Sequence, residues 1–197
     1  MFYSSIQSSL QEYKVAIMDR SQALEIVNRH IKNPQMVKHM LATEGVMRAL
    51  ARRLGEDEDR WGLAGLLHDA DAEIASSEEQ GLVVAKLTQN GLDEESATAI
   101  ASHNPYTGIK PKGRMGWALY AADPLTGLIV ASALVLPDKK LATLTAHSVL
   151  KRFAETRFAK GANREQIAAS SELGVTLEEF IEIGLAAMKS IAGDIGL

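Results

Sequence analysis

The chain has no cysteine among its 197 residues. Without cysteine it forms no disulfide bond and offers no thiolate to a metal ion. Any bound metal ion must therefore be held by His, Asp or Glu side chains. The absence of cysteine also agrees with a cytoplasmic location, which we expect for this protein.

An excess of positive charge is also lacking, because 21 Lys and Arg side chains face 25 Asp and Glu, for a formal net charge of −4. Nucleic acids and anionic membranes attract strongly basic surfaces. The charge balance therefore argues against broad binding to either of them. The sequence leaves the formation of a homo-oligomer open.

The first 18 residues lack the basic start and the long apolar run of a secretory signal. Regular amphipathic sequence begins only after Met18, so we expect residues 1–18 to form a loosely ordered tail. The remaining length suffices for a hydrophobic core, and the 46% apolar composition is that of an ordinary soluble protein. Residues 19–197 are therefore predicted to form a single domain.

Charge is nearly absent from the segment Met115–Leu136, in which Asp123 is the one charged residue. About 20 apolar residues suffice to span a membrane, so the length would fit. Asp123-Pro124 interrupts the segment at its centre, however, and no second segment flanked by Lys or Arg accompanies it. We predict two buried core helices here, residues 114–122 and 124–136, and no membrane span.

No run of alternating β-branched residues indicates a β-sheet, whereas apolar residues recur at helical spacing along most of the chain. We therefore predict an all-α fold, a single-domain helical bundle. Gly55 is a predicted C-cap, Asp93 and Thr176 are predicted N-caps, and residues 107–113 are predicted to form a loop. The other predicted helices span residues 21–31, 34–54, 61–70, 78–89, 94–102, 142–158, 164–171 and 177–195.

His68 and Asp69 close the apolar run Trp61–Leu67. Burial of an imidazole and a carboxylate is costly unless they are paired, hydrogen-bonded or bound to a metal ion. His39 borders the apolar face of the preceding helix, and Asp123 lies in a long apolar segment. These four side chains could form one site inside a bundle. Two His and two carboxylates suit one divalent ion such as Mn, Fe, Co, Ni, Mg or Zn.

Each of these residues also has a purely structural explanation. A single buried His is more often a satisfied core residue than a ligand. Asp123 before Pro124 fits the N-cap of a helix that begins with proline. His68 and Asp69 fit a hydrogen-bonded pair that ends a helix. The joint pattern favours a metal site, because all four are ligand types on helices that face the same core.

The order His39, His68-Asp69, Asp123 resembles the His…His-Asp…Asp signature of the HD superfamily of metal-dependent phosphohydrolases. Residues 37–71 resemble the first two helices of small single-domain HD hydrolases, and residues 118–140 resemble their segment with the last Asp. Residues 158–188 resemble an uncharacterised subgroup.

The resemblance implies a helical bundle of HD-domain type in which the four signature residues bind a divalent cation. It also implies hydrolysis of a phosphate ester or phosphoanhydride of a small phosphorylated substrate, such as a nucleotide, by a metal-activated water. A non-hydrolytic nucleotide-sensing or regulatory module is the main alternative. Metal-dependent oxidation, which some members of the superfamily carry out, is a weaker one.

Five further residues are candidates for roles beside the ligands. Asp71 could orient the attacking water or hold a supporting hydrogen bond behind a ligand, although it could also be a solvated acid at a helix end. His103 could donate a proton to the leaving oxygen, contact phosphate or complete a second metal site, although it could simply interact with a helix dipole. Lys110, Lys112 and Arg114 form a positive loop that could bind substrate phosphate if it folds over the metal. The alternative for this loop is a solvated charged surface.

Overall fold

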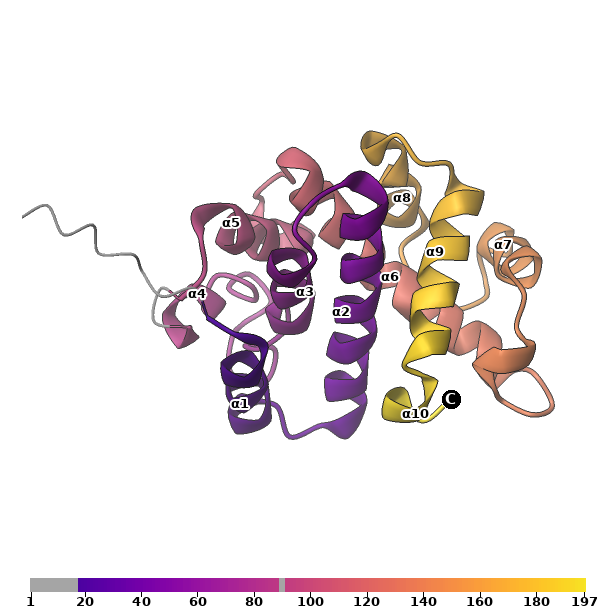
Figure 1. The fold of residues 1–197 in the computed structure, drawn as a ribbon, viewed down its shortest axis with the longest axis horizontal. Coiled ribbons are helices and arrows are strands. Elements are labelled where there is room, and N and C mark those ends of the chain that lie inside the picture. Colours follow the sequence, from indigo (N-terminus) through magenta and orange to yellow (C-terminus); the bar gives the residue numbers. More distant parts are fainter. Residues whose placement is uncertain (1–17, 89–90) are drawn as a thin grey trace, which may run out of the picture.

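The computed structural model describes residues 18–88 and 91–197, and every regular element in these ranges is a helix (Figure 1). The predicted all-α fold is therefore confirmed. The predicted tail lies outside the described residues except for Met18, which is buried and donates its N–H to the carbonyl of Gly91. The division into a tail and one domain stays a prediction.

The helices follow one another along the chain with short connections. The α-helices are α1 (Arg20–His30), α2 (Pro34–Leu54), α3 (Glu58–Leu67), α4 (Val84–Leu87), α5 (Glu94–His103), α6 (Gly113–Leu134), α7 (Ala146–Ala154), α8 (Arg164–Ala168), α9 (Leu177–Ser190) and α10 (Ala192–Ile195). The 3-10 helices are η1 (Pro105–Thr107), η2 (Leu141–Thr143) and η3 (Ala169–Leu173).

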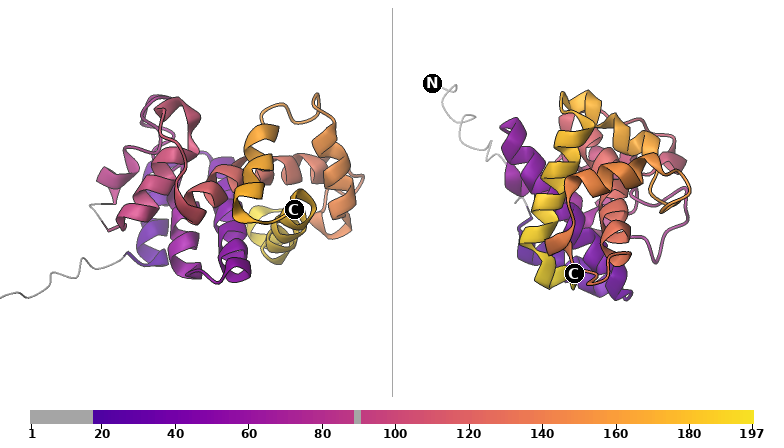
Figure 2. Two further views of the ribbon diagram at one scale, coloured as in Figure 1. Left: turned by 90° about the horizontal axis from the view of Figure 1, so that it is seen from above. Right: turned by 90° about the vertical axis from the view of Figure 1, so that its right-hand side faces the viewer.

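Helix α6 runs through the centre of the molecule. Helices α1 to α5 lie towards one end, and α7 to α9 lie towards the other (Figures 1 and 2). Helix α6 packs against α2, α5, α7, α8 and α9 and so joins the two ends. Helix α2 packs against α3 and α9 as well. Helices α2, α3 and α6 therefore form the core in which polar side chains are enclosed.

Three of the predicted caps are confirmed. Gly55 ends α2 in the left-handed conformation, with φ of 73°, where glycine avoids the steric cost of a Cβ atom. Asp93 begins α5 by accepting the N–H of Ser96, and Thr176 begins α9 by accepting the N–H of Glu179. These side chains replace hydrogen bonds that the first turn of a helix lacks.

The prediction of two helices around Asp123-Pro124 is wrong, because α6 continues through both residues as a single helix. Asp123 is therefore not an N-cap. Pro124 cannot donate to the carbonyl of Tyr120, and a proline in a helix interior normally costs about 3 kcal/mol. Burial of the apolar side chains before and after Pro124 offsets this cost. Although α6 is long and apolar enough to cross a membrane, 61% of its most apolar window is buried, as in a core helix.

The helix predicted over residues 78–89 is also wrong within its described residues, where only Val84–Leu87 is helical. Gly81 lies at φ of 90°, and a Cβ atom there would come within 2.7 Å of the carbonyl oxygen of Ile100. This close packing and the positive φ hold residues 76–83 in a series of turns.

Four other predicted helices differ by more than one residue at an end or are divided. The buried helix predicted over residues 61–70 begins earlier and ends earlier, because Asp57 caps α3 and the chain turns after Leu67. The predicted range 142–158 contains η2 and the shorter α7. The range 164–171 is divided into α8 and η3, and 177–195 into α9 and α10.

Candidate metal centre

His68 and Asp69 lie in the interior because the apolar run of α3 that precedes them is completely buried. All residues from Trp61 to Leu67 are buried, so the chain leaves the helix in the core. His68 is the C-cap and Asp69 follows it in the next turn. A Cβ atom on Gly65 would lie only 2.9 Å from the carbonyl oxygen of Thr43. Glycine thus lets α3 lie directly against α2, which carries His39.

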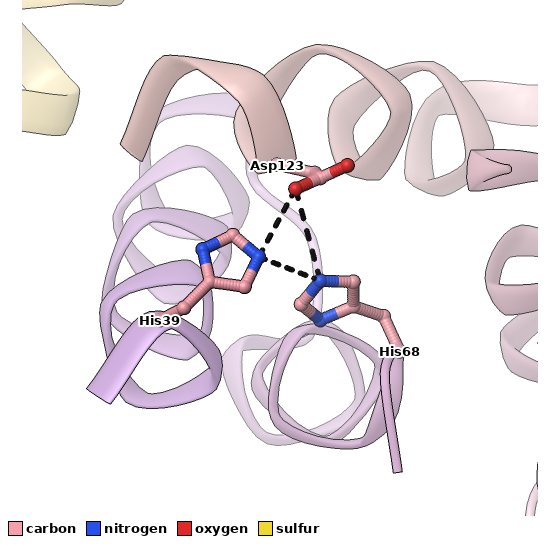
Figure 3. Close-up of side chains that lie close together, drawn as sticks. All are labelled: His39, His68 and Asp123. Atoms are coloured by element: carbon pink, nitrogen blue, oxygen red, sulfur yellow. Dashed lines mark hydrogen bonds and ion pairs between the residues drawn. The ribbon is translucent and has the colours of Figure 1, made fainter. Parts of the chain in front are cut away.

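Four predicted ligands meet at this point, and we call them the candidate cluster: His39, His68, Asp69 and Asp123. His39 comes from α2 and Asp123 from the middle of α6, facing the end of α3 (Figure 3). The Nε2 atom of His39 lies 3.1 Å from Nε2 of His68, 3.1 Å from Oδ1 of Asp123 and 3.6 Å from Oδ2 of Asp69. The Nε2 atom of His68 lies 3.3 Å from Asp69 and 3.9 Å from Asp123.

His103, the last residue of α5, extends the cluster on its buried side. Its Nε2 atom lies 3.3 Å from Oδ1 of Asp69, the oxygen that does not face His39. The described residues thus contain two overlapping groups of ligand atoms. One consists of His39, His68 and Asp123, and the other of His68, Asp69 and His103.

The outer nitrogens of the three imidazoles all act as hydrogen-bond donors. Nδ1 of His68 lies 2.8 Å from the carbonyl oxygen of Gly65, and Nδ1 of His103 is bonded to the carbonyl of Ile100. A carbonyl oxygen only accepts, so both nitrogens must carry the proton. Nδ1 of His39 donates to the Thr126 hydroxyl at 3.0 Å, because that hydroxyl donates its own proton to the carbonyl of Asp123.

This arrangement fits a divalent cation. With Nδ1 protonated, the Nε2 atoms of His39 and His68 carry lone pairs whenever these rings are neutral, and both atoms face the two carboxylates. Ligand atoms about 2.1 Å from one ion lie about 3.0 Å apart at right angles and about 3.4 Å apart in a tetrahedron. The separations of 3.1 to 3.9 Å in the candidate cluster are close to these values. A cation between the side chains would relieve the repulsion of their lone pairs.

The pKa values in the cluster favour charged groups despite burial. Burial alone would raise the pKa of Asp69, but the adjacent His68 and His103 hold it well below its usual value. Burial would likewise raise the pKa of Asp123, yet its hydrogen bond with His39 lowers it. Desolvation opposes protonation of His39, but Asp123 raises its pKa, and Asp69 raises the pKa of the buried His103 to about 9. The carboxylates therefore remain available as anionic ligands.

Solvent reaches the cluster from one side. The side chains of His39 and Asp123 are 24% and 27% exposed, whereas those of His68, Asp69 and His103 are exposed by 9% or less. The open side of the cluster therefore lies between α2 and α6.

Two neutral residues beside the ligands were not predicted from the sequence. Thr126 lies one turn after Asp123 and fixes the ring of His39, as described above. Gln80 donates from Nε2 to Oδ1 of Asp69 at 2.6 Å. Partners of this kind orient metal ligands in known sites. Threonine and glutamine are common polar residues, and no local spacing in the sequence distinguishes these two.

The structure does not support a direct catalytic role for Asp71. Its side chain is fully buried, and its carboxylate accepts the backbone N–H groups of Gly81 at 2.8 Å and Val83 at 3.1 Å. Burial raises its pKa, and these hydrogen bonds partly oppose the shift. The carboxylate is therefore occupied in shaping the turns of residues 76–83, from which Gln80 reaches Asp69.

The predicted phosphate-binding loop does not fold over the cluster. Arg114 pairs with Glu56 at 3.0 Å, and Lys112 lies beside the acidic first turn of α5, at the opposite end of that helix from His103. At 1.5 Å per residue, α5 separates the two ends by about 13 Å. Lys110 is exposed on the same loop. Glu56 holds Arg114, and Lys110 and Lys112 are exposed, so the alternative of a solvated charged surface describes these cations better.

Comparison with known proteins agrees with this arrangement. Residues 36–133 match the family model of the HD domain. The matched segment contains the whole candidate cluster together with His103 and both neutral partners. No curated protein matches the chain.

Proposed function

The chain belongs to the HD superfamily of metal-dependent phosphohydrolases, and on this premise we propose that it hydrolyses a small phosphorylated molecule. The bond cleaved would be a phosphate ester or a phosphoanhydride, and nucleotides are the first class to test. One divalent ion would be held by the candidate cluster, in agreement with the metal binding of HD domains. A cytoplasmic location remains a prediction, and the formation of a homo-oligomer remains open.

The observation that carries the proposal is the common direction of the Nε2 atoms. His39 and His68 come from different helices, yet both direct Nε2 to the same carboxylates while Nδ1 is bonded elsewhere. A bound divalent ion lowers the pKa of a coordinated water and offsets charge on a phosphoryl oxygen. A purely structural His–Asp pair would not need three helices to converge on it.

The residues of the chain would contribute position and protection from bulk water. Asp69 is held from its far side by His103 and by Gln80, so its other oxygen stays directed at His39 and His68. In the metal-free chain, Asp69 raises the pKa of His103. The open edge beside His39 and Asp123 would admit the phosphoryl group.

One observation favours the alternative of a nucleotide-sensing module without hydrolysis. Neither Arg114 nor Lys112 reaches the cluster, and Asp71 is occupied by backbone N–H groups. Among the described residues that were predicted to assist catalysis, only His103 touches the candidate cluster. Thermal shift with nucleotides but no turnover with any of the metals would support this alternative.

Metal analysis and phosphate release together test the proposal. The purified chain would be loaded in turn with Mn, Fe, Co, Ni, Mg and Zn and assayed on nucleoside and sugar phosphates. Asp69→Asn and His68→Ala are expected to lose bound metal and activity. His147→Ala, which removes an exposed histidine on α7, is the matched control and should keep both. Full metal retention in both cluster variants, with their helical content intact, would remove the proposed site.

A further inference from the structure

A cavity of about 480 Å³ lies beside the candidate cluster, between α2, α6 and the residues that follow α9. It is lined on α2 by Gln35, Lys38, His39 and Ala42, on α6 by Thr126, Gly127, Val130, Ala131 and Leu134, and elsewhere by Ile195, Gly196 and Leu197. Its volume is within the usual range for small-molecule sites.

The cavity is continuous with the open side of the cluster. His39 belongs to both, and its bonding partner Thr126 also lines the cavity wall. Asp123 lies one turn before Gly127, and residues spaced by four share one face of a helix. A molecule with its phosphoryl group beside Asp123 would therefore extend along α6 past Gly127 towards Leu134.

The lining is suited to an aliphatic group. Six of its twelve lining residues are Ala, Val, Leu or Ile, and the imidazole of His39 is the one aromatic ring among them. A nucleobase is usually held by stacking on rings and by several hydrogen bonds to its edges. Apart from His39 and Thr126, which are bonded to one another, only the side chains of Gln35 and Lys38 could offer hydrogen bonds. Stacking is thus limited to the ring of His39, which is already held by Thr126, and edge recognition is limited as well.

We propose that this cavity binds the apolar part of the substrate, so that the substrate is the phosphate ester of an aliphatic alcohol. The inference rests on the proposed function and narrows its substrate class away from nucleotides. The side chain of Lys38 lies beside Gly196 in the cavity wall. Its methylene groups would contact the aliphatic group of the substrate.

Binding of n-alkylphosphonates tests the inference without requiring turnover. The dissociation constants of methyl-, butyl- and hexylphosphonate for the metal-loaded chain would be measured by calorimetry, with AMP as the nucleotide probe. Each buried methylene improves affinity about fourfold. If half of the methylenes added from methyl to hexyl are buried, affinity should rise about thirtyfold, and hexylphosphonate should bind more tightly than AMP. Equal affinities along the series, or tighter binding of AMP, would overturn the inference.

Gly127→Phe provides a variant that fills the cavity with little strain. Gly127 is exposed, and a Cβ atom there would meet nothing within 4 Å, so the ring would occupy the open space. The hexyl-to-methyl affinity ratio is expected to fall at least tenfold. Gly161→Phe is the matched control, since Gly161 is equally open but does not line the cavity. An unchanged ratio in Gly127→Phe would contradict the inference.

The two proposals fail in different ways. If no phosphate is released from any ester with any metal, the hydrolytic function fails, while the chain-length dependence of phosphonate binding still decides the inference. If phosphate is released but affinity does not depend on chain length, the function stands and the aliphatic substrate class is wrong.

Discussion

Replacement of Thr126 by valine should weaken metal binding without removing a ligand. The threonine hydroxyl accepts the Nδ1 proton of His39 at 3.0 Å and donates to the carbonyl of Asp123 at 2.8 Å. Valine keeps the shape and loses both bonds. The buried N–H of His39 would then lack a partner, which costs about 1 to 3 kcal/mol. His39 could avoid this cost by turning its ring, and Nε2 would then no longer face Asp123.

The expected loss in metal affinity is about 10- to 100-fold, the usual effect of removing a partner that orients a ligand. It would be measured by competition with a chromophoric chelator. Thr126→Ser should restore the affinity, because it keeps the hydroxyl. Ser132→Ala is the matched control on the same helix, where a buried hydroxyl donates only to the carbonyl of Leu128.

Ser132→Ala and Thr126→Val should both lower the free energy of unfolding by about 1 kcal/mol. Only Thr126→Val should change metal affinity. If the affinity of Thr126→Val stays within about twofold of the original, then Thr126 does not orient His39, and the account of the protonated Nδ1 atoms is wrong.

Three other perturbations test separate parts of the structure. Gln80→Ala should weaken metal binding about tenfold in the same titration, since Gln80 holds one oxygen of Asp69; unchanged affinity would contradict this role. Gly81→Ala should lower the free energy of unfolding, measured in urea, by about 2 kcal/mol, because Gly81 lies at φ of 90° and an added Cβ atom would clash with the carbonyl of Ile100. A loss smaller than about 0.5 kcal/mol would contradict this role of Gly81. In the chelated protein, the raised pKa of His103 contributes stability that is full below pH about 6.5 and is lost as the pH rises through about 9. His103→Gln should flatten that part of the melting-temperature profile, and a profile that keeps its slope would show that another group is responsible.

The position of the candidate cluster could be anticipated because its members lie on strongly patterned helices. The apolar run before His68 and the apolar stripe beside His39 both indicate a buried face, and buried faces of neighbouring helices meet. Asp123 stands out as the one charged residue of a long apolar segment, and the family resemblance then joins all four residues into one signature. Local pattern and global fold agree at these positions, as is typical of foldable sequences.

The predictions that proved wrong concern segments whose local structure is decided by contacts with distant parts of the chain. Asp123-Pro124 resembles a helix start in isolation, and only the burial of α6 on both sides of it makes a continuous helix favourable. Residues 78–83 contain good helix formers, yet Asp71 and the close approach to Ile100 hold them in turns. Arg114 is paired with Glu56, which lies far away in the sequence. None of these contacts leaves a signal within the segment itself.

The contact at Gly65 has a consequence for which ions the protein can accept. The backbones of α2 and α3 are in direct contact there. The distance between the helices that carry His39 and His68 is therefore set by the main chain, which adjusts far less easily than side-chain packing does. Ions with ligand distances of about 2.1 Å match the 3.1 Å between the two Nε2 atoms, whereas Ca²⁺, at about 2.3 to 2.6 Å, would need them farther apart. We therefore expect the cluster to bind small divalent ions more tightly than Ca²⁺.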